Sequence, residues 1–131
     1  MKHYNVVAAV VCNGKKYLCM QKGETRFAYT SHKWEFPGGK IEPHETPQQA
    51  LKRELLEEMD YPISVGEKIT TINHQYPDFS ITMTAFLCSP LSEKFVMKEH
   101  SDYKWTDIEE LHSLDWAAAD VHIVNAIHKC K

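Results

Sequence analysis

Three glutamates in the segment 53–58, Glu54, Glu57 and Glu58, form an acidic run with regular spacing. On a helix, spacings of three and four residues place these carboxylates on one face. Adjacent like charges weaken an isolated helix, whereas a hard divalent cation stabilises them, because Mg²⁺ binds carboxylate and phosphate oxygens. The run therefore predicts a magnesium site that holds a phosphate-containing substrate.

A glutamate-rich helix is more often a solvent-exposed face than a metal site. Here, however, the acidic run lies at fixed distances from Gly39, Glu45 and Arg53. With ordinary residue usage, a chance match to this combination is on the order of 10⁻⁷ per start position. The combined pattern, rather than the glutamates alone, favours the metal site.

The helix that carries the run has clear start and stop signals. Thr46 is a candidate N-cap, Pro47 occupies the first helical position, and Gln49 completes a capping box. Asp60 can close the helix in a left-handed conformation, and Pro62 prevents its continuation. The apolar residues at helical spacing are Ala50, Leu51, Leu55 and Met59. This side can pack while the carboxylates face a cleft.

Strand-forming runs lie on both sides of this helix in the sequence. Strands are expected over 4–12, 16–21, 34–36, 63–75, 79–88 and 103–106. Turns are expected at 13–14, 38–39 and 76–78, a loop over 23–33 and a helical turn over 107–111. A closing helix over 117–129 would bury Val121, Val124 and Ile127. This order indicates an α+β fold with a mixed sheet between helices.

The length of 131 residues supports a single domain over 1–131 with a modest core. The net charge is −3 and Arg26 and Arg53 are the only arginines, so no binding to duplex nucleic acid is expected. The apolar run 6–11 is too short to span a membrane. We expect a cytoplasmic protein that is a monomer or a homodimer.

The four cysteines and eight histidines show no spacing typical of a metal site. The cysteines are Cys12, Cys19, Cys88 and Cys130. They contain no Cys-x-x-Cys pair, and three lie in apolar runs, so reduced, buried thiols are expected.

The segment 39–58 resembles the Nudix box of the MutT/Nudix hydrolases, Gly-x5-Glu-x7-Arg-Glu-hydrophobic-x-Glu-Glu-x-Gly-hydrophobic. The segment 34–40 is similar to the strand and loop before the box in MutT-like nucleoside triphosphate pyrophosphohydrolases. Asp60 and Tyr61 depart from the pattern at the helix exit, where the family has Gly and a smaller aliphatic residue. The resemblance implies the Nudix α/β/α sandwich.

The resemblance also implies roles for the acidic residues. Glu57 and Glu58 would be the main metal ligands, together with the backbone carbonyl of Gly38, where a glycine permits close approach. Glu54 would be a metal ligand, or would orient or deprotonate the attacking water; the sequence leaves both open. Glu99 is either a plain loop glutamate or a further catalytic group near the metal.

Arg53 and Glu45 are predicted to pair with the box carboxylates and to fix the loop against the helix. The alternative for Arg53 is an ordinary surface ion pair, which contributes little to stability. Its position in the motif favours the structural clamp, and Arg53 is placed with the catalytic set for that reason.

The substrate-binding residues are expected to be Lys22, Trp34, Glu35, Phe36, Pro37, Gly38, Gly39, Tyr76 and Asp120. Lys22 is similar to a basic residue that contacts phosphates in the family. Aromatic side chains, including Phe79, can stack on a base without discriminating between bases. About half of these aromatic residues are expected to be purely structural.

Asp120 is similar to the position that reads the base in MutT-like enzymes. Those that clear 8-oxo-dGTP have Asn there, whereas a subgroup acting on CTP, dCTP and 5-modified dCTP has Asp. An ionised Asp can only accept hydrogen bonds, so it suits the exocyclic amine of cytosine. Two alternatives remain: Asp120 caps the last helix, or it is protonated when buried and donates to a guanine base.

These features predict a Mg²⁺-dependent nucleoside triphosphate pyrophosphohydrolase, with Mn²⁺ as a substitute metal. Its products would be a nucleoside monophosphate and pyrophosphate, with CTP, dCTP and 5-modified dCTP as favoured substrates. The alternative within this class is an 8-oxo-dGTP diphosphatase that sanitises the nucleotide pool. The alternative from another class is a non-catalytic nucleotide-binding module, which the retained carboxylates disfavour.

Overall fold

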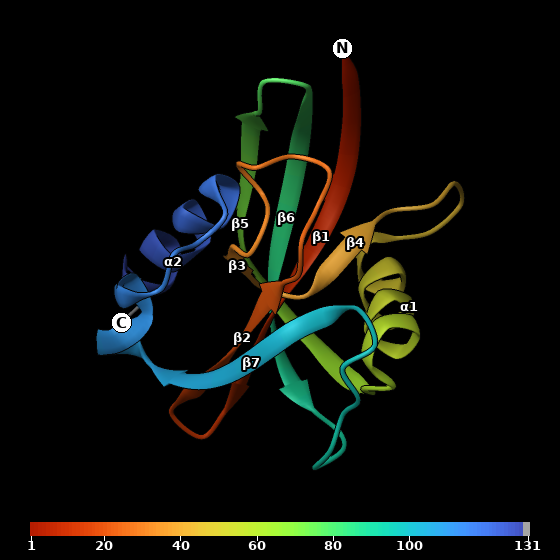
Figure 1. Cartoon of the computed structure of the whole chain (residues 1–131). Helices are drawn as coiled ribbons and strands as arrows, with labels where there is room; N and C mark the ends of the chain where they lie inside the picture. The colour runs from red at the N-terminus through yellow and green to blue at the C-terminus, as the bar shows by residue number, and fades with distance from the viewer. Residues whose placement is uncertain (130–131) are drawn as a thin grey trace.

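The computed structural model describes residues 1–129, in which a mixed sheet lies between two helices (Figure 1). The strands are β1 (Lys2–Asn13), β2 (Lys16–Lys22), β3 (Trp34–Glu35), β4 (Gly38–Lys40), β5 (Ile63–Gln75), β6 (Phe79–Pro90) and β7 (His100–Asp107). The helices are α1 (Pro47–Met59), the short 3₁₀ helix η1 (Ile108–Ser113) and α2 (Ala118–Lys129). The expected α+β architecture is confirmed.

The sheet is organised around β1. The strand order is β3-β2-β1-β6-β5, while β4 pairs with β1 and β7 pairs with β2. β1 runs parallel to β6, from Lys2 opposite Phe79 to Val11 opposite Cys88. The β1–β2 and β5–β6 pairs are antiparallel hairpins. The chain therefore combines local hairpins with one long-range parallel pair at the centre of the sheet.

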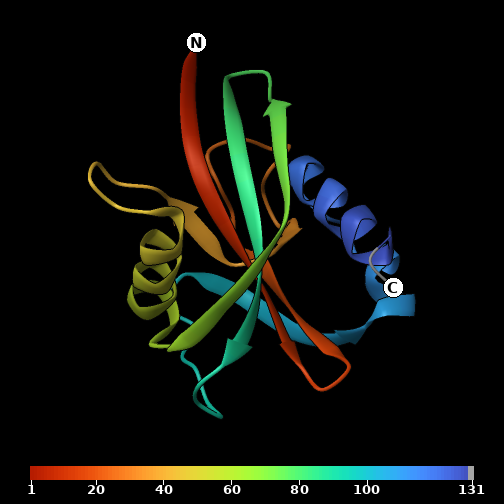
Figure 2. The same ribbon diagram turned by 180° about the vertical axis from the view of Figure 1, so that it is seen from behind.

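The two faces of the sheet support separate cores, because β1 is buried on both sides. Successive side chains of a strand point to opposite faces. Accordingly, Val7 and Ala9 pack with α1, whereas Ala8 and Val10 pack on the side covered by α2. Viewed from behind, α1 and α2 again lie on opposite sides of the strands (Figure 2). The α/β/α arrangement implied by the resemblance is thus confirmed.

Two local predictions were wrong. Residues 38–39 were expected to form a turn, but Gly38 and Gly39 lie in β4, opposite Ala8 and Val7 of β1. Glycine has a low strand propensity, and here its missing side chain permits the close approach of β1. In α2, Val121 is 38% exposed. The helix instead packs through Ala119, Ile123, Val124 and Ile127.

Cys19 and Cys88 are buried free thiols, and Cys12 is half-buried. Cys130 lies outside the described residues. Within residues 1–129, no helix is long and apolar enough to cross a membrane.

Candidate active site

The start and end of α1 are fixed as the sequence predicts. The Gln49 backbone N–H donates to Thr46 Oγ1 at 3.1 Å, and the Thr46 backbone N–H donates to Gln49 Oε1 at 2.9 Å. Asp60 has φ of 51°, and its N–H donates to the carbonyl of Leu56. The buried residues of the helix are Ala50, Leu51, Leu55 and Met59. Because both ends and the buried face are fixed, the side of the helix on which each acidic residue lies is fixed too.

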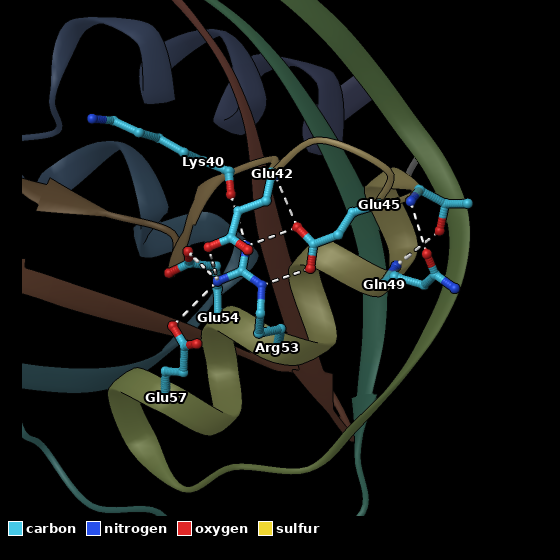
Figure 3. Close-up of polar contacts among 8 residues, drawn as sticks. Lys40, Glu42, Glu45, Gln49, Arg53, Glu54 and Glu57 are labelled. Carbon is cyan, nitrogen blue, oxygen red and sulfur yellow. Dashed lines mark hydrogen bonds and ion pairs between the residues drawn. The ribbon is translucent and has the colours of Figure 1, made fainter.

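Arg53 forms the centre of a dense polar cluster on α1 (Figure 3). Its Nε and Nη2 donate to the two carboxylate oxygens of Glu45, at 2.6 and 2.9 Å. Its Nη1 donates to Glu54 at 2.9 Å and to Glu57 at 3.2 Å. Nη2 also donates to the carbonyl of Lys40 at the end of β4. The predicted pairing is confirmed, and it ties the loop before α1 and the end of β4 to the helix.

This cluster changes the acidity of its members. The hydrogen bonds from Arg53 hold the pKa of Glu45 below its usual range, and Glu45 in turn raises the pKa of Arg53. For Glu54, burial dominates and raises its pKa, although Arg53 opposes the shift. A Cβ at Gly39 would collide with the Glu54 carboxylate. The second glycine therefore makes room for this carboxylate beneath β4.

Gly38 is required for a different reason from the one expected. A Cβ at Gly38 would collide with the backbone carbonyl of Val7 in β1. Pairing of β4 with β1 thus explains the glycine without a ligand. Whether the Gly38 carbonyl also binds metal stays a prediction.

Glu58 differs from the other acidic residues of the helix, because it is half-buried, with its Oε2 atom fully buried, and forms no ion pair with any cation among residues 1–129. Its Oε2 makes no hydrogen bond to any residue that the structure describes. Burial, the adjacent carboxyl of Glu99 and the negative charge of Glu54 raise the pKa of Glu58 to about 9. A buried, unpartnered carboxyl oxygen among like charges suits a divalent cation, which would bind it and offset the repulsion.

The predicted metal ligands are not yet gathered around one point. In residues 1–129, no three acidic, histidine or cysteine side chains have an arrangement that could hold a metal ion. The Glu57 side chain is 60% exposed and bonds to Arg53 instead of turning towards Glu58. Binding of a cation by the three glutamates would therefore require Glu57 or Glu54 to release Arg53.

A cavity of about 600 Å³ lies beside Glu58, and it brings distant parts of the sequence together. Its aromatic lining includes Phe36 and a group of four rings, Tyr4, Phe27, Tyr76 and Phe79, in which Phe79 contacts the other three. Its ionisable lining, apart from the tyrosines, consists of Lys22, Glu24, Glu35, Lys40, Glu58, Glu99, His100 and Asp120. The site therefore offers stacking surfaces next to a group of carboxyls and cations.

Most of the predicted substrate residues line this cavity. They are Lys22, Glu35, Phe36, Gly38, Gly39, Tyr76 and Asp120. Trp34 and Pro37 do not line it. Trp34 is a core residue, 9% exposed, and the Pro37 carbonyl accepts a hydrogen bond from Ala9 in β1. Both residues help to hold the strands together, and a role for them in substrate binding stays a prediction.

Asp120 lies at the inner wall of the cavity and is 6% exposed. Its Oδ2 accepts a hydrogen bond from the Phe36 backbone N–H at 2.9 Å. Burial and the nearby charge of Glu35 raise the pKa of Asp120 to about 8. The cap considered for Asp120 is provided by Tyr76, whose hydroxyl accepts a hydrogen bond from the Ala119 N–H. Burial and the charge of Glu35 both favour the protonated form of Asp120.

Two parts of the site were not predicted from the sequence. The loop 23–33 brings Phe27 onto Phe79 and Tyr29 onto Tyr76, with ring centroids 5.9 and 5.6 Å apart. His100 of β7 contacts Glu35 of β3 across β2, at 2.9 Å. The only sequence signal for His100 is its position next to Glu99.

Comparisons with known proteins agree with this geometry. A family model described as the NUDIX domain matches residues 1–127. Over 126 residues the chain is 32% identical to a CTP pyrophosphohydrolase of Escherichia coli (strain K12), covering 96% of this chain and 92% of that one. Over 100 residues it is 33% identical to an 8-oxo-dGTP diphosphatase of Proteus vulgaris, covering 76% and 88%.

A solved structure extends the likeness over the full length. The solution NMR structure of MutT, a Nudix hydrolase from methicillin-resistant Staphylococcus aureus 252, is 38% identical with a TM-score of 0.77. The match covers 100% of both chains. This chain therefore belongs to the NUDIX family: it is a Nudix hydrolase, an enzyme that cleaves phosphoric anhydrides with a divalent metal ion.

Proposed function

We propose that this enzyme hydrolyses nucleoside triphosphates to nucleoside monophosphates and pyrophosphate, using Mg²⁺ or, as a substitute, Mn²⁺. The observation that carries the proposal is Glu58. Its buried carboxyl oxygen lacks a partner and faces a cavity that also offers aromatic surfaces. The names of the E. coli and Proteus relatives, a pyrophosphohydrolase and a diphosphatase, support the same reaction class.

Different residues would bind the metal, contact the phosphates and activate the attacking water. Glu54, Glu57, Glu58 and the Gly38 carbonyl would hold the metal, which supplies charge neutralisation and lowers the pKa of a bound water. Lys22, with its ammonium group at the cavity, would contact the triphosphate. Glu99 adjoins Glu58 and, like Glu54, is a candidate for orienting or deprotonating the attacking water.

Cytidine triphosphates are the favoured substrates in this proposal. The CTP-hydrolysing relative matches nearly the whole chain. The cavity also presents the Glu35 carboxylate, an acceptor suited to an exocyclic amine.

The second candidate substrate is 8-oxo-dGTP, and Asp120 favours it. Its raised pKa, about 8, leaves a proton that can be donated to a base carbonyl at neutral pH. Comparing kcat/KM for CTP, dCTP, 5-methyl-dCTP and 8-oxo-dGTP under identical Mg²⁺ concentrations decides between the two candidates.

Replacing Glu57 with Gln tests the hydrolytic function itself. The variant should lose most of its activity and keep its fold, because a neutral amide is a poor ligand for a hard cation. Phosphate release would be measured after coupling to inorganic pyrophosphatase, and circular dichroism would confirm the fold. Full turnover by the variant on every nucleotide would show that the metal assignment is wrong. If instead the wild type binds nucleotides but does not hydrolyse them, the protein is a non-catalytic binding module.

A further inference from the structure

We propose that His100 is a positioning residue that holds the Glu35 carboxylate in the cavity, ready to accept a hydrogen bond from an N–H group of the nucleotide base. This inference rests on the proposed function, because it concerns the same cavity. Three elements build the arrangement: β2 ends at Lys22, β3 ends at Glu35, and β7 begins at His100.

The strand pairing explains how these residues meet. Lys22 lies opposite His100 across β2 and β7, after an irregularity in the register between Gln21 and Lys22. Glu35 lies opposite Met20, two residues earlier on β2. Side chains two residues apart on a strand share a face, so all three polar side chains reach the same side of the sheet.

Each oxygen of Glu35 faces one nitrogen. His100 Nε2 lies 2.9 Å from Oε2, within hydrogen-bond distance, and Lys22 Nζ lies 3.6 Å from Oε1. The lysine is 39% exposed and the glutamate 21%, whereas the histidine side chain is only 3% exposed. The histidine is therefore the rigid partner, and the carboxylate takes its orientation from the imidazole.

The second ring nitrogen shows that packing alone does not explain a histidine here. His100 Nδ1 is buried and has no hydrogen-bond partner among residues 1–129. When Nε2 donates to Glu35, a neutral ring leaves Nδ1 as an acceptor without a donor, which lowers stability. An apolar residue of similar size would avoid that loss, so the bond to Glu35 is the contact that a histidine adds.

Orientation matters for Glu35 because its side chain is long and the cavity holds competing charges. A free glutamate loses rotamer entropy when it binds a ligand, whereas a fixed one has lost it already. Asp120 is held in a comparable way, by the Phe36 N–H. Glu35 and Asp120 thus form two fixed carboxyl groups on the cavity wall, one anchored by a histidine and one by a backbone amide.

The test uses binding of α,β-methylene-CTP, which is not hydrolysed at that bond, together with kcat and KM for CTP. His100→Leu fills the same space without an N–H, and should raise Kd and KM about tenfold with little change in kcat. His100→Gln keeps a donor and should recover most of the affinity. Glu35→Gln should weaken binding to a similar degree, and adding His100→Leu to it should cause no further loss.

His112→Gln is the matched control. His112 is an exposed histidine that contacts Asn125 at 3.0 Å, outside the cavity. The Kd of the His112→Gln variant for the analogue should therefore equal that of the wild type. Thermal unfolding checks that each variant is folded, and Glu35→Gln provides the comparison if His100→Leu is not.

Several outcomes would overturn the inference. Additive effects of His100→Leu and Glu35→Gln would show that the two residues act independently. A fall in kcat with unchanged Kd would show that His100 acts through its neighbour Glu99. If the wild type binds the analogue but releases no pyrophosphate from CTP, only the proposed function is refuted. The role of His100 would still be tested, because the Kd values of the variants can be compared with that of the wild type. A wild type that binds no nucleotide would refute both.

Discussion

Two groups of acidic side chains meet at α1, and their surroundings are opposite. The Arg53 cluster consists of Arg53, Glu45, Glu54 and Glu57. The cavity carboxyls are Glu35, Glu58, Glu99 and Asp120. In the Arg53 cluster a shared guanidinium lowers the pKa of Glu45. Among the cavity carboxyls, burial raises the pKa of Glu58 to about 9 and that of Asp120 to about 8.

The contrast is sharpest between two neighbouring residues. Glu57 is 60% exposed and bonds to Arg53, whereas Glu58 is half-buried and its buried Oε2 has no hydrogen-bond partner among residues 1–129. Consecutive side chains on a helix point about 100° apart, so the two glutamates face different environments. One carboxylate is neutralised within the protein, and the other is left for a cation that comes from outside. In this structure the Glu57 carboxylate therefore stabilises the fold, whereas the Glu58 carboxyl is available to bind a ligand.

The largest expected effect comes from Glu58→Gln, which replaces a carboxyl that can ionise on binding a cation with an amide that cannot. Turnover of the favoured nucleotide should fall on the order of 10³-fold, because the metal loses a buried anionic ligand. Initial rates at saturating Mg²⁺ measure this loss. Glu109→Gln, at an exposed position on η1, is the control and should keep wild-type rates. A Glu58→Gln variant with more than a tenth of wild-type turnover would remove Glu58 from the metal site.

A smaller effect is expected from Arg53→Lys, which alters the Arg53 cluster without changing its charge. Lysine cannot reproduce the two bonds to Glu45 together with those to Glu54 and Lys40. Loss of such a supporting residue should lower activity by roughly 10–100-fold, mainly through weaker metal binding. Titration of activity against Mg²⁺ concentration measures this effect.

The control for Arg53→Lys is Glu42→Gln. Glu42 lies 3.7 Å from Arg53 and is 63% exposed, so its loss should change activity less than twofold. If Arg53→Lys and Glu42→Gln behave alike, the Arg53 cluster is an ordinary surface network.

The smallest expected effect is a change in how the unfolding free energy depends on pH when Asp120 is replaced with Asn. The folded protein holds the Asp120 proton up to about pH 8, whereas the unfolded chain releases it near 3.8. Stability from this group is therefore fully present below about pH 4 and is lost as pH rises through 8. Between pH 6 and 7, the wild type should lose about 1.4 kcal/mol of unfolding free energy relative to Asp120→Asn.

Urea denaturation at pH 6 and pH 7 measures this difference. Asp102→Asn, at an exposed position on β7, provides the control, and its stability should run parallel to that of the wild type. If the unfolding free energies of Asp120→Asn and the wild type change equally between pH 6 and pH 7, Asp120 is already ionised in the folded protein.

Sequence reasoning succeeded where local rules determine the structure. The capping box of Thr46 and Gln49, the left-handed Asp60 and the buried side of α1 all depend on residues within a few positions of each other. The pairing of Arg53 with Glu45 was also predictable, since both belong to one short motif. These features determine the helix and therefore the position of its acidic residues.

It failed where long-range contacts decide the outcome. Gly38 and Gly39 form a strand because β1 lies beside them, which no local pattern reveals. The buried side of α2 depends on what covers it, so Val121 was misplaced. The contact between His100 and Glu35 joins residues from different thirds of the chain. Local spacing also could not reveal that Glu57 and Glu58 would meet different surroundings.

The parallel pairing of β1 with β6 has a consequence for how the protein is made. The strand at the centre of the sheet, β1, is synthesised well before its parallel partner β6, which starts only at Phe79. Until the ribosome has released residues 79–90, β1 can pair only with the short strands β2 and β4. Nascent chains must therefore keep this apolar strand from aggregating while β2, β3, β4, α1 and β5 are synthesised, and completion of the sheet comes late.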